Sequence, residues 1–275
     1  ILVDDNLKNI NLYPSKDLNL VSGSRVKLEG YQLGDSLLIT TNENNIQTLV
    51  YNKEINDNIG EQRILVILMD WIDKDNILYQ TISREEAYDA VFNKANEYYK
   101  ENSYNKMYFT GDVIGPYQTT EDCSSYFEAM RETIKQVDKD VNFQNYDRII
   151  IFYPFYLRQN EICNYDGASL SGKSELITED GTIKASVSLD LRSSLWVVGH
   201  ELGHDLGLSH ANRLDCNNYG YFDLDKCDIK DYGDPFDIMC NVGTRPLTPH
   251  LNAYNKEKLG WFKKEEEHTT AINGE

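Results

Sequence analysis

The chain has 275 residues, with 27 Lys and Arg against 45 Asp and Glu, and a formal net charge of −18. This acidic balance argues against nucleic acid or an anionic membrane surface as a partner, because both require cations that face phosphates. No apolar run approaches the ~18 residues that a membrane-spanning helix needs. We therefore expect a globular, monomeric protein of one or two domains, with no nucleic-acid partner and no membrane span.

The first 59 residues differ in pattern from the rest of the chain. Turn-forming Asn, Asp, Ser and Gly separate short alternating stretches such as 25–28 and 36–40. This pattern predicts a small β-rich module of short strands. Residues 56–60 form a plausible junction, so we place the module at 1–59 and a second domain at 60–275. The sequence leaves open whether the module is a retained pro-region, an exosite or a folding aid.

Strands and helices alternate in the second domain. The apolar run at 63–70 predicts a buried strand, and a capping-box match at 83–86 opens a helix. Further strands are expected at 106–110, 148–153, 168–171 and 185–189, and further helices at about 127–137, 194–206 and 251–259. About forty residues after 207 resemble a loop. The order predicts an α+β fold.

The most specific chemical signal lies on the helix expected at 194–206. His200 and His204 are four residues apart, so on a helix their rings project from one face, one turn apart. Two such imidazoles can bind one Zn²⁺ ion. Glu201 follows the first histidine and can reach a metal-bound water without binding the metal. This is the H-E-x-x-H arrangement of two ligands and one general base.

Two further residues extend the motif. Gly207 and His210 follow His204 at intervals of three. A straight helix would carry His210 away from the metal, but glycine tolerates the left-handed conformation that ends helices. The chain can then turn sharply and return His210 as a third ligand. Three nitrogen ligands and an open position are typical of one catalytic zinc ion rather than a structural one.

The extended motif resembles that of the metzincin zinc peptidases, whose second signature is a methionine turn beneath the metal. Met239, 29 residues after His210, is the candidate. Some metzincins add a tyrosine ligand two residues after this methionine, but position 241 is Asn, so we expect none here. The resemblance implies a catalytic domain with a mixed, mostly parallel twisted sheet, long helices, a zinc helix and a Met-turn.

Within the metzincins the chain looks most similar to the gametolysin family. The similarity rests on four stretches: 60–68, Cys163 with 167–169, 232–239, and 251–253 with 259–261. Together they span about residues 60–262. The resemblance implies a secreted or cell-surface zinc endopeptidase that acts on a protein or peptide substrate.

The expected mechanism uses Glu201 as the general base. Zinc lowers the pKa of its water toward ~7, Glu201 takes the proton as this water attacks the scissile carbonyl, and Glu201 passes it to the leaving amine. Two alternatives stay open at this point. One is a non-catalytic binding module with a structural zinc, which the intact Glu201 disfavours. The other is a zinc hydrolase of a non-peptide bond.

Several neighbouring residues are weaker candidates. The stretch Ala168, Ser169 and Leu170 resembles the metzincin edge strand, which aligns substrate through its backbone. Arg245 belongs to the segment expected to wall the pocket after the cleaved bond. Tyr232 and Tyr254 are possible oxyanion helpers, whereas His250 and His268 lack partner spacing. Six aspartates offer a low-specificity Ca²⁺ site, although their spacing does not match an EF-hand: Asp223, Asp225, Asp228, Asp231, Asp234 and Asp237.

The five cysteines all lie in the second half of the chain. Cys216 and Cys227 are close enough to close one loop, and Cys123 and Cys163 can form a second bridge. An odd count leaves at least one thiol outside any internal pair, and Cys240 is the candidate. Cysteines capable of forming disulfides agree with an extracellular location.

Overall fold

The computed structural model describes six short strands within residues 1–50, by their backbone, and residues 58–179, 181–216, 227–240 and 248–262 in full. The chain divides into two compact units, Ile1–Ile55 and Asn56–Glu275. The boundary falls at residue 55 rather than at 59 because Asn58 is bound into the second unit. Its backbone oxygen accepts a hydrogen bond from Trp261 Nε1 at 2.9 Å, and its side-chain oxygen accepts one from Arg148 at 3.2 Å.

The described residues of the first unit are six short strands. A four-stranded sheet has the order β1-β2-β5-β4, and β3 and β6 form a separate antiparallel pair. Among these described strands, only β2 and β5 pair in parallel. The bounds are β1 Leu2–Val3, β2 Asn9–Pro14, β3 Arg25–Leu28, β4 Tyr31–Leu33, β5 Ser36–Ile39 and β6 Ile46–Val50.

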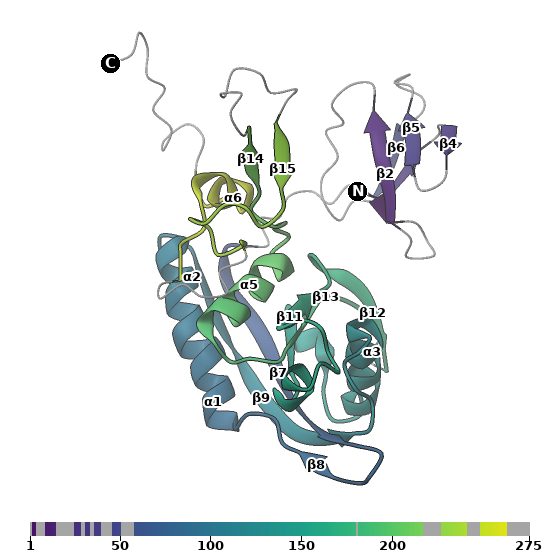
Figure 1. Ribbon diagram of the computed structural model, residues 1–275, viewed down its shortest axis with the longest axis vertical. Coiled ribbons are helices and arrows are strands. Elements are labelled where there is room, and N and C mark those ends of the chain that lie inside the picture. The colour runs from purple at the N-terminus through teal and green to yellow at the C-terminus, as the bar shows by residue number, and fades with distance from the viewer. Residues whose placement is uncertain are drawn as a thin grey trace. The chain divides into compact units, whose positions relative to one another are not determined.

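The second unit is organised around a mixed, mostly parallel sheet (Figure 1). Its path is β11-β13-β10-β7-β8, with β12 also paired to β13 and β9 to β7. Four strands of this sheet run parallel to one another: β9, β7, β10 and β13. The other three pair in the antiparallel direction: β8, β11 and β12. The bounds are β7 Gly60–Ile72, β8 Leu78–Tyr79, β9 Met107–Thr119, β10 Arg148–Phe152, β11 Gly167–Ser169, β12 Ser174–Thr178 and β13 Gly181–Asp190.

Helices cover both faces of this sheet, which explains the continuous apolar run in β7. Alternate residues point to opposite faces of a strand, so Ile64, Val66 and Leu68 pack in one core and Leu65, Ile67 and Met69 in the other. The first core also contains the helical stretch from Arg84 to Asn102 and helix α5, whereas α3 belongs to the second core. Figure 1 shows α1 and α2 on one side of the sheet and α3 on the other.

The helices begin close to where the sequence places them. Ser83 caps α1 by accepting a hydrogen bond from Glu86 N at 3.1 Å, as the capping box predicted. A π-helical turn, η2, joins α1 to α2 in one continuous stretch. The bounds are α1 Arg84–Tyr88, η2 Asp89–Ala95, α2 Asn96–Asn102, α3 Tyr126–Val137, the 3₁₀ turn η3 Phe143–Asn145, α4 Tyr156–Gln159, α5 Leu195–Asp205 and α6 Ala253–Lys258. No helix among the described residues is long and apolar enough to cross a membrane.

The structure differs from the sequence expectation mainly in the strands. β9 runs to Thr119, beyond the expected end at 110, although Gly111, Gly115 and Pro116 interrupt its pattern. The region expected as a loop after 207 contains an antiparallel hairpin, β14 Arg213–Asp215 with β15 Asp228–Lys230. Disulfides join Cys123 to Cys163 and Cys216 to Cys227, and the second of these closes the hairpin. Cys240 is buried and lies outside both disulfides.

Candidate metal centre

Three histidines from two consecutive segments converge at the end of α5. Ser194 begins this helix by accepting a hydrogen bond from Val197 N, and it is followed by the apolar residues that anchor α5 in the core. His200 and His204 lie one turn apart on the helix, and His210 follows its end. One ring nitrogen of each histidine lies within 4.8 Å of the other two. This group can hold a metal ion.

The turn after α5 explains how His210 reaches the group. Gly207 has a φ of 93°, a left-handed conformation that favours glycine. Its N–H donates to the His204 carbonyl at 2.8 Å, and Leu208 N–H donates to the Gly203 carbonyl at 3.0 Å. These two bonds are the Schellman pattern that ends a helix. The chain therefore turns back at the position where the sequence required it.

Hydrogen bonds orient each ring of the group. The Nδ1 atoms of His200 and His204 lie 2.8 Å from the carbonyl oxygens of Ile238 and Leu208, respectively. His210 Nδ1 lies 3.3 Å from Asp231 Oδ2. Because carbonyl and carboxylate oxygens accept, Nδ1 carries the proton in each ring and Nε2 keeps its lone pair for a metal.

Burial keeps the two helical histidines neutral. It lowers the pKa of His200 to about 4, with a further contribution from the nearby His204. Burial likewise lowers the pKa of His204 to about 4. Both rings are therefore uncharged at neutral pH, and the uncharged ring is the form that binds a metal.

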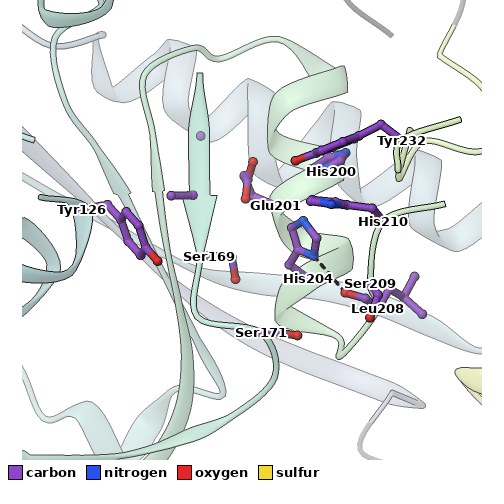
Figure 2. A pocket seen from close by; sticks show the side chains of 12 residues that line it. Tyr126, Ser169, Ser171, His200, Glu201, His204, Leu208, Ser209, His210 and Tyr232 are labelled. Carbon is purple, nitrogen blue, oxygen red and sulfur yellow. Dashed lines mark hydrogen bonds between the residues drawn. The ribbon is translucent and has the colours of Figure 1, made fainter. Parts of the chain in front are cut away.

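Glu201 is buried beside this group, and its side chain points into the same space as the three rings (Figure 2). Gly167 of β11 lies against it, since a Cβ atom at 167 would lie 2.6 Å from Glu201 Cγ. Burial raises the pKa of the Glu201 carboxyl well above its ordinary value, and the carboxyls of Asp190 and Asp205 raise it further. Such a carboxyl holds a proton more strongly than an exposed one.

Met239 lies beneath the group, where the resemblance places a Met-turn. It is fully buried, and a Cβ atom added at Gly203, between the two helical histidines, would overlap its sulfur. Asp237 fixes the turn: it accepts from Met239 N at 2.8 Å and from Asn252 N at 2.7 Å. Ala211 N then donates to the Met239 carbonyl at 2.9 Å, which ties the turn to the chain that follows His210.

The group opens into a cavity of about 420 Å³. Ala168 and Ser169, two of the three edge-strand candidates, line it, whereas Leu170 packs against the second core. β11 ends the path of the sheet, and its described pairing is with β13 on one side. Ser169 Oγ donates to Asp205 Oδ1 at 2.6 Å and so ties β11 to α5. Arg245, the candidate for the opposite wall, lies outside the described residues.

Other candidates from the sequence lie apart from this site. Tyr254 is 70% exposed on α6, and His250 pairs with Glu101, so neither lines the cavity. Asp223, Asp225 and His268 lie outside the described residues. The other four aspartates bond to nearby side chains or backbone groups: Asp228, Asp231, Asp234 and Asp237. Among the described residues, the histidines form the one group of three or more side chains suited to a metal.

No family model and no curated protein matches this sequence.

The sequence named Tyr232 as an oxyanion helper and Asp231 as part of a Ca²⁺ site, but it did not place either residue beside His210. Asp231 bonds to His210, and the ring of Tyr232 stacks on His210 with centroids 3.5 Å apart. Both follow β15, about twenty residues after His210 in sequence, and the hairpin closed by Cys216–Cys227 returns them to the metal centre. This distant connection left no local pattern to find. A histidine that binds a metal usually donates its other ring N–H to an acceptor. This rule gave a general reason to expect a hydrogen-bond partner for His210.

We expect Asp231→Asn to weaken metal binding by about 10-fold, the lower end of the effect of such partners, because the carboxylate is 64% exposed. Titration with Zn²⁺ against a competing chelator measures the change. Asp228→Asn is the matched control, since Asp228 is 65% exposed on the same hairpin and bonds to Lys230 instead. Equal affinities for the two variants would show that Asp231 does not orient His210.

Proposed function

We propose that this chain is a zinc-dependent endopeptidase. The observation that supports it most directly is the convergence of three imidazoles beside a buried carboxyl, in an open cavity. A purely structural site would need no such carboxyl. The three-nitrogen set of His200, His204 and His210 fits zinc, which takes imidazole ligands in tetrahedral sites. The open side of the cavity leaves room for a fourth, exchangeable ligand.

Glu201 has the position and environment of a general base. A bound zinc ion supplies two things, a water of lowered pKa and stabilisation of the developing oxyanion. Glu201 takes a proton from the attacking water and later gives it to the leaving amine. Burial favours the protonated form of the carboxyl, which is the form that exists between the two transfers. Gly167 limits where this side chain can lie and thereby orients it.

An extended peptide is the substrate that this cavity favours. β11 lines the cavity with Gly167, Ala168 and Ser169, and its outer edge offers backbone groups to a peptide that adds as a further strand. This arrangement favours a peptide over a non-peptide ester or amide. The two disulfides agree with an extracellular protein, so we propose a secreted or cell-surface location.

The test is cleavage of casein and of a peptide library by the purified full chain. We expect cleavage that stops with the chelator 1,10-phenanthroline and returns on addition of Zn²⁺. Cleavage that persists after metal removal, or zinc-loaded protein that cleaves nothing, would contradict the proposal. The library also defines the substrate preference.

A further inference from the structure

Tyr232 is positioned to act on the substrate rather than only to support the site. Its ring lines the cavity and stacks on His210, with centroids 3.5 Å apart and planes at 29°. The same ring lies parallel to His200, with centroids 5.9 Å apart and planes at 15°. The tyrosine therefore covers two of the three candidate ligands.

The backbone holds Tyr232 there at a conformational cost. Its φ is 56°, a left-handed conformation that is rare for a bulky residue. Surrounding contacts impose it: Gly233 N donates to the Lys230 carbonyl at 3.1 Å, and Asp234 N donates to the Ala211 carbonyl at 3.0 Å. Glycine or asparagine would adopt this conformation more readily. A large aromatic residue at such a point suggests a task for its side chain.

The hydroxyl of Tyr232 is available for that task. Figure 2 shows the side chain extending over His200 with its oxygen toward Glu201. Tyr232 is 37% exposed, and no hydrogen bond joins its hydroxyl to another of the described residues. A phenol is neutral at physiological pH and can donate one hydrogen bond. The donor thus lies at the edge of the space that the three imidazoles and Glu201 enclose.

We propose that Tyr232 is a catalytic residue whose hydroxyl donates a hydrogen bond to the scissile carbonyl oxygen as that oxygen becomes negatively charged. The inference rests on the proposed peptidase function and deepens it. A donor aimed at developing charge strengthens in the transition state and contributes about 10²–10³-fold to kcat. The position differs from that of a tyrosine two residues after the methionine, because Tyr232 precedes Met239 and comes from the hairpin.

The variant Tyr232→Phe tests the contribution of the hydroxyl independently of that of the ring. Phenylalanine keeps the stacking on His210 and removes one oxygen that has no described partner. We expect kcat to fall about 10²-fold, with little change in KM and with bound zinc and thermal stability unchanged. Tyr254→Phe is the matched control, since it removes the same atom from a residue 70% exposed on α6, and it should retain wild-type activity.

A binding measurement that requires no turnover supplies the second readout. A phosphinic peptide mimics the tetrahedral, negatively charged transition state, so its dissociation constant should rise by the factor by which kcat/KM falls. In the Glu201→Gln background, the affinity for an uncleaved substrate peptide should not depend on the Tyr232 hydroxyl.

Three results would overturn the inference. Unchanged kcat and phosphinate affinity in Tyr232→Phe would show that only the ring matters. Loss of zinc in this variant would indicate a supporting role for His210. An equal loss of affinity for the uncleaved peptide would indicate ground-state binding. If the wild-type protein itself neither cleaves peptides nor binds the phosphinate, the proposed function fails and the inference with it.

Discussion

We expect Glu201→Gln to lose about 10²–10⁴-fold in kcat/KM while it retains its metal. Glutamine has the same shape, so it fits against Gly167, where a Cβ atom would already lie 2.6 Å from the side chain. It cannot accept and return a proton as the carboxyl does. The histidine group does not include Glu201, so metal affinity should remain. Steady-state kinetics together with zinc content measures both effects.

Glu97→Gln is the control for this substitution. Glu97 is exposed on α2 and pairs with Lys100, away from the cavity. The activity of the Glu97→Gln enzyme should equal that of the wild type. A Glu201→Gln enzyme with native turnover would contradict the role of general base, whereas loss of both zinc and activity would place Glu201 among the metal ligands.

His204→Ala should lose both metal and activity. The four-ligand structural zinc sites of zinc-finger peptides contribute about 10–16 kcal/mol, or roughly 3–4 kcal/mol per ligand. On that scale the loss of one imidazole should weaken zinc binding by about 10²–10³-fold. Competition with a zinc chelator measures this cost. Added Zn²⁺ should raise the unfolding temperature of the wild type but not of the variant, because only the former binds it tightly.

His250→Ala provides the comparison for this ligand. His250 pairs with Glu101 and packs edge-on against Tyr98, outside the histidine group. The His250→Ala protein should keep native zinc affinity. A His204→Ala protein that binds zinc as tightly as His250→Ala does would show that His204 is not a ligand.

The metal centre was the part of the molecule most accessible from sequence, because its geometry is local. Helical periodicity alone places His200 and His204 on one face, and Gly207 supplies the left-handed turn that returns His210. The helix expected at 194–206 is observed at Leu195–Asp205. The hydrogen bonds to Nδ1, which leave Nε2 available to bind a metal, depend on how the rings pack in the folded protein. The motif alone therefore did not predict them.

The hairpin β14–β15 escaped prediction for a different reason. Its described residues are largely exposed, including Leu214 and Ile229, so no alternation of buried and exposed side chains marks the two strands. The disulfide Cys216–Cys227 closes it, and the sequence allowed this pair without requiring it. Asp231 and Tyr232 reach His210 through this hairpin, which is why their contacts with that ring emerge only from the structure.

The strands of the main sheet, in contrast to the hairpin, were largely recognisable from the sequence. Burial on both faces makes the apolar run of β7 easy to recognise, and β10 follows the same rule. The prediction ended β9 at residue 110, just before Gly111, and glycine and proline usually interrupt strands. In the fold, Gly111 lies so close to Ile64 of β7 that a side chain there would overlap its backbone. The glycine therefore permits the pairing of β9 with β7.

X-ray absorption and elemental analysis of the purified full chain test the central claim most directly. We predict about one zinc ion per chain, bound by three imidazole nitrogens at about 2.0–2.1 Å and one exchangeable oxygen ligand. A protein that binds no transition metal, or a zinc coordinated by sulfur or by fewer than three imidazoles, would contradict the account.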